Sequence, residues 1–328
     1  MKIAILGAGF CGLATAWYLI QKGISELVII DPLGIGKGAS GVAAGLLHAY
    51  AGSQAKKNIR ADEGMSATLE LLKAAETAIG SSVIVSKGLV RLAVSEKQKI
   101  DFANVALLYP DVHWMTSDEC SQKLGYVQPY PGIFIDSAVV VDCEKYLQGL
   151  WKDCSSKGVT FEKRKILGLR ELEKFDHVIV TMGAQSKNLP ELSEIKVTPI
   201  KGQVLEIDWP QELPTPLFPI ASQAYLIMQD EKKKCISGAS YERYFFNEEP
   251  DMKSALEDIL PKLNAYMPQI DASFVKGCRA GVRASAPRHQ PLLKKIDDKT
   301  WLLTGMGSKG LLYHALYAEE LVSRLFTE

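Results

Sequence analysis

The sequence predicts an α/β protein in which both ends of the chain build one parallel-sheet domain, interrupted by an inserted, mostly antiparallel β (α+β) domain. Glycine-rich turns follow short apolar strands near both termini, as at the carboxyl edge of a parallel sheet. The region between them contains β-branched or alternating runs, which are typical of antiparallel strands. We expect the first domain to comprise residues 1–85, 135–196 and 275–328, and the inserted domain residues 86–134 and 197–274.

The first domain begins with a strand–turn–helix–strand unit, in which strands over 2–6 and 24–30 flank a helix over 10–22. Its turn has the pattern G-x-G-x-x-G. Gly7 permits the tight turn, Gly9 lets the backbone approach a pyrophosphate, and Gly12 lets the helix pack closely on the strand. Asp31 closes the second strand, where its carboxylate can bind a ribose hydroxyl. The unit predicts a Rossmann-like dinucleotide site but does not choose between NAD and FAD.

Periodicity and flanking residues assign the remaining elements in chain order. Ser117 is the expected N-cap of one helix and Asp142 of another. We expect helices over 60–79, 96–109, 117–124, 143–151 and 254–266, a last helix from about 309, and strands over 88–94, 132–141, 178–181, 197–207, 225–229, 234–239 and 301–304.

The C-terminal glycine turn, "GMGSKGL", favours a flavin. A helix that starts near 307–310 offers free N–H groups and the positive end of its dipole. That end would stabilise the negative charge of a reduced flavin at N1 and C2=O. An ordinary strand-to-helix turn explains the same glycines equally well, and an NAD-dependent dehydrogenase stays open as a weaker alternative.

Composition limits the partners and the compartment. Lys plus Arg equals Asp plus Glu at 38 each, which argues against a strongly basic nucleic-acid binder without excluding a local patch. The six cysteines show no C-x-x-C pair or metal-ligand spacing, so we expect no metal and reduced thiols in a cytoplasmic protein. Glycines interrupt the uncharged N-terminal run, so we expect neither a secretion signal nor a membrane span.

Residues 38–52, "GASGVAAGLLHAYAG", predict a surface that something large approaches closely. Ser40 can offer a hydroxyl and a helix N-cap to phosphates. Small side chains, Ala44 and Gly45 among them, keep bulk away from a cofactor. Leu46 to His48 would then pack toward its isoalloxazine ring.

Together these features resemble the D-amino-acid oxidase-like family of FAD-dependent amine oxidoreductases, which includes glycine oxidase and sarcosine oxidase. The resemblance rests on G-x-G-x-x-G with Asp31, "GASG", "VIVTMGA" and "GMGSKGL". Residues 38–52, "PIKGQV", "RAGVRASAPRHQPLL" and "GMGSKGL" further resemble the FAD domain of the bifunctional enzyme that completes methylaminomethyl-2-thiouridine in tRNA. That enzyme carries a methyltransferase domain before its FAD domain. Because this chain begins at the first strand, methylation is expected from a separate protein or not at all.

The resemblance implies a reaction and a cofactor site. The reaction is hydride transfer from a carbon beside an amine nitrogen to flavin N5, followed by hydrolysis of the imine and reoxidation by oxygen or another acceptor. No cysteine has an obvious attachment context, so FAD is expected to be non-covalent. Besides the residues named above, the expected FAD-binding set is Phe10, Cys11, Pro32, Ala39, Lys165, Ile166, Thr181, Gly183, Gly281, Arg283, Gly305, Gly307, Ser308, Lys309, Gly310 and Leu311.

The expected catalytic residues are Arg283, Tyr241 and His48. Arg283 falls where glycine oxidase-like members bind the substrate carboxylate, and a planar guanidinium matches that anion better than an ammonium does. Arg279 and Arg288 flank it and remain alternatives. A tyrosine such as Tyr241 is more often a packing residue, and His48 could equally have a structural role, as could His289 and His314.

The favoured function is oxidation of a carboxymethyl-bearing secondary amine, with a wobble uridine of tRNA as the favoured substrate. The small-molecule alternative is an oxidase of glycine, sarcosine or a D-amino acid. A flavin-binding partner protein without turnover is the alternative from another class.

Overall fold

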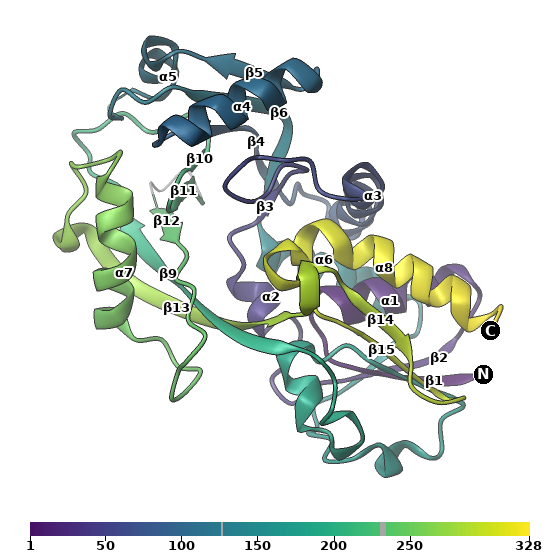
Figure 1. The fold of residues 1–328 in the computed structure, drawn as a ribbon. Helices are drawn as coiled ribbons and strands as arrows, with labels where there is room; N and C mark the ends of the chain where they lie inside the picture. The colour runs from purple at the N-terminus through teal and green to yellow at the C-terminus, as the bar shows by residue number, and fades with distance from the viewer. Residues whose placement is uncertain (126, 230–233) are drawn as a thin grey trace.

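The computed structural model describes residues 1–125, 127–229 and 234–328. Two sheets organise the chain (Figure 1). The first has six strands in the order β14-β15-β8-β1-β2-β7, and every neighbouring pair is parallel except β14–β15. Its strands, drawn from both ends and the middle of the chain, are β1 (Lys2–Leu6), β2 (Glu26–Ile30), β7 (Thr160–Glu162), β8 (His177–Val180), β14 (Leu292–Lys295) and β15 (Thr300–Thr304).

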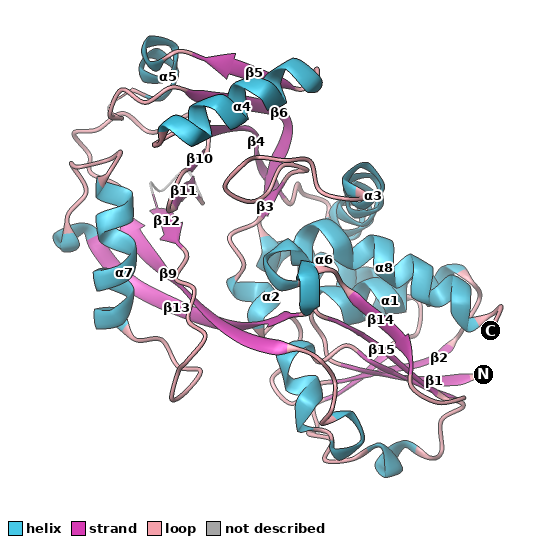
Figure 2. Ribbon diagram, in the orientation of Figure 1, coloured by secondary structure: helices cyan, strands magenta, loops and turns pink. Residues whose placement is uncertain are grey.

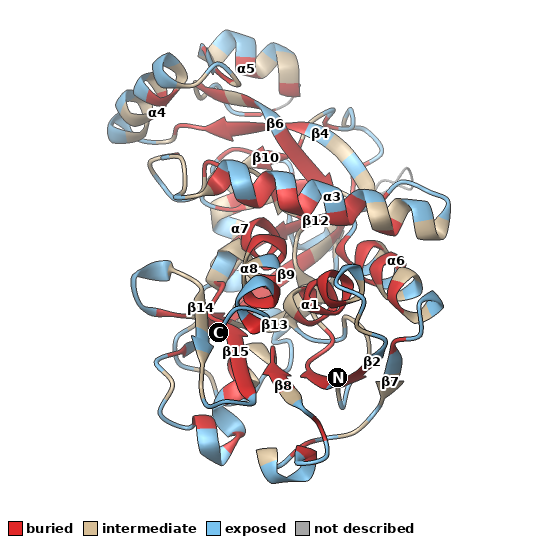
Figure 3. Cartoon of the chain, turned by 90° about the vertical axis from the view of Figure 1, so that its right-hand side faces the viewer, coloured by how far each residue is buried: buried red, intermediate tan, exposed pale blue. Residues whose placement is uncertain are grey.

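Both faces of this sheet are buried, which explains why its strands are continuously apolar. Ile3 and Ile5 of β1 join the main core, while Ala4 and Leu6 join a second core on the opposite face. Figure 3 shows α1 and α8 as largely buried helices. The helices that contribute most to the main core are α1 (Phe10–Gln21), α3 (Ala61–Ile79), α6 (Cys143–Ser156) and α8 (Gly310–Leu325).

The second sheet has nine strands and is mostly antiparallel (Figure 2). Helix α7 (Met252–Asn264) packs on one face through Ala255, Ile259 and Leu263. Helices α4 (Glu96–Leu108) and α5 (Ser117–Leu124) contact β5, which pairs with β6 of this sheet. The strand order is β13 (Val275–Ser285), β9 (Thr198–Asp208), β12 (Lys234–Gly238), β11 (Tyr225–Met228), β10 (Ile220–Ala221), β4 (Ile84–Leu92), β6 (Gly132–Val141) and β3 (Leu46–Leu47), with β5 (Val112–Met115) on β6.

The architecture confirms the expected fold class, and two local features differ from the expectation. The N-cap of α5 is Thr116 and not Ser117, because Thr116 and Glu119 form a reciprocal capping box. Strand β13 was not predicted, since its Gly-, Ala- and Arg-rich sequence has no β-branched run; pairing with β9 along its length defines it. The domain boundaries remain a prediction, and β6 and β13 of the larger sheet lie largely within segments assigned to the first domain.

Within the described ranges, no helix combines the length and the apolar character that crossing a membrane requires.

Candidate functional site

The glycine turn between β1 and α1 is built as the fingerprint requires. Gly7 has φ +105°, and a Cβ there would lie 2.7 Å from the Thr181 carbonyl oxygen. A Cβ on Gly12 would lie 1.9 Å from the Gly7 carbonyl oxygen. Both obstacles are backbone atoms, so neither can move aside cheaply. Thr181 also donates its hydroxyl hydrogen to the Leu6 carbonyl, which fixes the turn against β8.

The N-terminus of α1 faces the small-residue stretch. Ser40 accepts a hydrogen bond from the backbone N–H of Phe10 at 3.1 Å, and a Cβ on Gly9 would lie 2.7 Å from the same hydroxyl. The first turn of α1 contains no acidic side chain. The positive end of the helix is therefore free for an anion, and Ser40 lies beside it.

Asp31 connects the ends of β1 and β2. Its carboxylate accepts hydrogen bonds from the N–H groups of Ala8 at 2.9 Å, Leu33 at 2.8 Å and Gly34 at 3.1 Å. These bonds hold the glycine turn against the segment that begins at Pro32.

The stretch 38–52 contains β3, which is itself a strand of the larger sheet. A Cβ on Gly45 (φ +82°) would lie 1.9 Å from the Val141 carbonyl oxygen, so only glycine fits there. Ala44 and Leu46 pack against Val140, Ile227 and Ile236 on the face of the larger sheet opposite α7. The short helix α2 (Ala39–Val42) rests on β13, where a Cβ on Gly281 would come within 3.1 Å of the Ala39 Cα.

The second glycine turn meets the first. A Cβ on Gly310, where α8 starts, would contact the ring of Phe10 at 3.7 Å. Thr304 donates its hydroxyl hydrogen to the Gly183 carbonyl at 3.0 Å. The carboxyl ends of β1, β8 and β15 therefore meet at one edge, which also carries the remaining residues expected there, Gly305, Gly307, Ser308, Lys309 and Leu311.

Three other expected cofactor residues differ in their surroundings. Ile166 is buried in the second core of the parallel sheet, whereas Lys165 is exposed. Cys11 is in the first turn of α1, and burial raises the pKa of its thiol to about 12. It therefore stays protonated at neutral pH.

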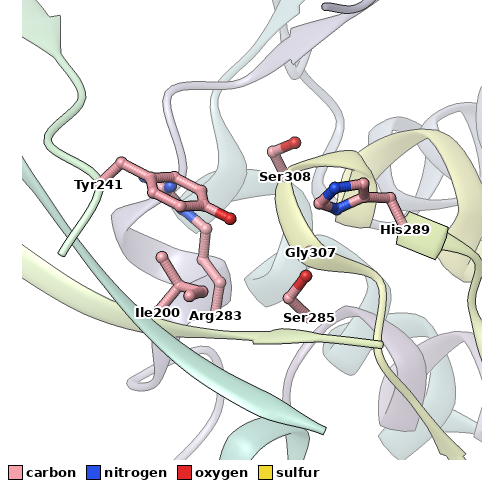
Figure 4. Close-up of a pocket in the computed structure, with 7 residues that line it drawn as sticks. All are labelled: Ile200, Tyr241, Arg283, Ser285, His289, Gly307 and Ser308. Atoms are coloured by element: carbon pink, nitrogen blue, oxygen red, sulfur yellow. The ribbon is translucent and has the colours of Figure 1, made fainter. Parts of the chain in front are cut away.

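A cavity of about 60 Å³ opens beside this edge (Figure 4). Arg283 on β13 and Tyr241 after β12 contribute to its wall, and the Tyr241 hydroxyl points into the space between the lining residues. The sequence had not indicated Ile200 or Ser285, although Ser285 lies two residues from Arg283 and so on the same strand face. The described lining is Ile200, Tyr241, Arg283, Ser285, His289, Gly307 and Ser308.

Arg283 lies across the neighbouring strand because Gly202 has no side chain. A Cβ on Gly202 would fall 2.0 Å from a terminal guanidinium nitrogen of Arg283. No acidic partner is recorded for Arg283 among the described residues. Arg279 is instead paired with Glu206, with Nε 2.9 Å from a carboxylate oxygen, and Arg288 is exposed. Of the three arginines, Arg283 is the one that lines the cavity.

His48 and His314 both lie outside the described cavity lining. The Nδ1 of His48 accepts from the Tyr50 N–H, and burial with nearby Arg91 lowers the pKa of this side chain to about 3. His314 is fully buried, and burial lowers its pKa to about 4. Its Nε2 lies 2.7 Å from the Tyr146 hydroxyl, which holds the ring within the core.

Comparison with known proteins agrees with this geometry. A family model described as FAD dependent oxidoreductase (DAO) matches residues 2–324. The chain belongs to the DAO family of FAD-dependent oxidoreductases. FAD is therefore the cofactor of this DAO-family enzyme.

Two solved structures share the DAO fold. Glycine oxidase from Geobacillus kaustophilus superposes with a TM-score of 0.87 at 19% identity, over 99% of this chain and 94% of that one. Iminodiacetate oxidase from Chelativorans sp. BNC1 superposes with a TM-score of 0.84 at 18% identity, over 100% and 96%.

A curated relative is the tRNA 5-methylaminomethyl-2-thiouridine biosynthesis bifunctional protein MnmC of Hydrogenovibrio crunogenus. It is 25% identical over 96% of this chain and 50% of its own length. The chain thus spans about half the length of the curated relatives it matches.

The residues of this DAO-family chain fit FAD. The glycine turn after β1 is too tight for side chains at Gly7 and Gly12, and the N-terminus of α1 has no acidic side chain in its first turn, so this end of the helix suits a pyrophosphate. Among the described residues, no group of three His, Cys, Asp or Glu side chains is placed to hold a metal ion.

Proposed function

We propose that this enzyme oxidises the C–N bond of a secondary amine that carries a carboxymethyl group, with carboxymethylaminomethyl-uridine at the wobble position of tRNA as its favoured substrate. The observation that carries the proposal is Arg283, which lines a small cavity without an acidic partner among the described residues. A guanidinium binds a carboxylate through two parallel charged hydrogen bonds. Tyr241 and Ser285 add hydroxyl donors to the same space.

The lining also favours the reactive form of the amine. Bound FAD supplies the acceptor for the hydride that leaves the carbon beside the amine nitrogen. The described lining contains no carboxylate that would stabilise an ammonium ion, and the positive charge of Arg283 disfavours one. The amine is therefore held with its lone pair free. Water then hydrolyses the oxidised C=N bond.

Two findings support tRNA as the carrier of this amine. Curated relatives that cover nearly the whole chain are named for tRNA 5-methylaminomethyl-2-thiouridine biosynthesis. The cavity of about 60 Å³ suits a carboxymethylamino end, and neighbouring residues of β9 and of the loop after β12 line a wider hollow that can accept a larger group. The small cavity and the glycine oxidase fold favour a second candidate, oxidation of free glycine, sarcosine or a D-amino acid.

Incubation of the purified protein with carboxymethylaminomethyl-modified tRNA, and separately with each free amino acid, tests the two candidates. We expect loss of the modified nucleoside by mass spectrometry together with release of glyoxylate. Glyoxylate from free glycine with an unchanged nucleoside profile would refute the tRNA substrate. A purified protein without an absorption band near roughly 450 nm would refute flavin chemistry altogether.

Arg283→Ala tests the carboxylate site. We expect retained FAD and a KM raised about 100-fold, as for the loss of a charged bidentate contact. Arg283→Lys should recover only part of the loss. An unchanged KM in Arg283→Ala would show that another residue binds the carboxylate.

A further inference from the structure

A loop beside the cavity carries the most exposed aromatic side chains in the described part of the chain. We define the aromatic loop as residues 241–246, "YERYFF", between β12 and α7 (Figure 1). Phe246 is fully exposed, Tyr244 is 94% exposed and Tyr241 is 49% exposed. Large apolar side chains placed together on a surface mark a binding site, since water disfavours them there.

The loop is fixed at its base and free at its tip. Lys201 and Glu242 exchange two backbone hydrogen bonds, of 3.0 and 2.9 Å, which add the start of the loop to β9. At the other end, the Asp251 N–H donates to the Gln203 side chain at 2.6 Å. The aromatic rings therefore project from an anchored support, which lowers the entropy cost of binding to them.

The exposed rings border a hollow whose lining residues are neighbours in the chain of those that line the cavity. Thr198, Pro199 and residues 243–246 line an open hollow of about 420 Å³. Ile200, the next residue of β9, lines the cavity that holds Arg283, and Tyr241 at the start of the loop lines it as well. The aromatic loop therefore starts at the cavity wall with Tyr241 and leads to the hollow lined by residues 243–246.

The chemistry of the hollow matches single-stranded nucleic acid. Flat aromatic faces stack on bases of any sequence, and an arginine adds a cation that stacks and pairs with phosphate. Arg243 lies among the rings, 5.8 Å from the centre of the Tyr241 ring. The acidic side chains of Glu242 and Glu248 accept hydrogen bonds from Gln203 and Gln185.

We propose that the aromatic loop stacks against the unpaired bases that flank the substrate uridine in the anticodon loop. The proposal rests on the tRNA substrate proposed above and identifies the surface that holds it. Net charge of the chain is zero, so stacking rather than a broad basic surface supplies the recognition.

Binding of a fluorescein-labelled, unmodified anticodon stem-loop to the FAD-loaded enzyme, followed by anisotropy at fixed salt, tests the proposal. We expect Tyr244→Ala and Phe246→Ala each to weaken binding about tenfold, as for the loss of one stacked base. Tyr244→Phe should retain the affinity. Phe326→Ala, which removes a half-exposed aromatic ring at the end of α8, is the matched control and should bind as the unaltered protein does.

Phe246→Leu separates bases from a protein partner. Leucine keeps an apolar surface but has no aromatic face, so base stacking predicts weaker binding. Equal affinity of the Leu and Phe proteins, or no binding of the stem-loop by the unaltered protein, would overturn the proposal.

Turnover distinguishes failure of this proposal from failure of the proposed function. If the enzyme oxidises modified tRNA but the Ala variants keep its KM, the aromatic loop is not the RNA surface and the function stands. If the stem-loop binds through the aromatic loop but modified tRNA is not oxidised, the surface stands and the substrate proposal fails.

Discussion

Gly202→Ala is a demanding test of the proposed carboxylate site, because it displaces the Arg283 side chain without replacing Arg283 itself. The new methyl group would fall 2.0 Å from a terminal nitrogen and 2.5 Å from the central carbon of the Arg283 guanidinium. These atoms end a flexible side chain, so the guanidinium moves while the strand stays. We expect the free energy of unfolding to change by less than about 1 kcal/mol.

The loss of function should be much larger than the loss of stability. A hydrogen bond to a charged group contributes about 1.5–3 kcal/mol, so misplacing the guanidinium should raise KM for the carboxylate substrate about 10- to 150-fold. Steady-state kinetics with an N-substituted glycine measure KM, and the flavin absorbance per protein reports FAD content, which should not change.

A matched control and a double variant make the reasoning refutable. Gly277→Ala places a methyl group 2.2 Å from a Glu206 carboxylate oxygen on the same strand pair, away from the cavity, and should leave KM unchanged. Gly202→Ala should add nothing in an Arg283→Ala background, because both changes remove one interaction. An unchanged KM in Gly202→Ala, or full additivity, would refute the proposed role of Gly202.

Three further predictions concern the fold. Gly12→Ala meets a backbone oxygen at 1.9 Å and should lower stability by roughly 2 kcal/mol or more and release FAD, seen as lost visible absorbance and a lower Tm. Burial lowers the pKa of His314 from its ordinary value of 6.5 to about 4, so between pH 4 and pH 6.5 this side chain binds a proton only when the protein unfolds. The free energy of unfolding should therefore fall by up to about 3 kcal/mol as the pH drops from 6.5 to 4. Urea titrations across this pH range should show a smaller dependence on pH for His314→Gln. Thr116→Val should cost about 1 kcal/mol through the lost cap with Glu119, whereas Ser117→Ala should cost little; equal effects would contradict the capping box.

Local pattern was enough to predict the cofactor half of the molecule. Gly7 takes a positive φ in the turn, and Gly12 approaches the Gly7 carbonyl five residues before it, and such local requirements leave a spacing in the sequence. The continuous apolar runs of β1 and β15 likewise reflect burial on both faces of one sheet. These features depend on short-range geometry, so the parallel-sheet domain could be recognised before its partners in space were known.

Tertiary structure alone placed the residues that surround the cavity. Ile200, Arg283, Tyr241 and Ser308 come from four separate elements, and their approach depends on the pairing of β9 with β13 and on the glycine turn before α8. Gly202 has no local reason to be glycine. Its reason is the side chain of Arg283, about 80 residues away along the chain and adjacent only across a strand pair, and a long-range contact of that kind leaves no periodicity for the sequence to reveal.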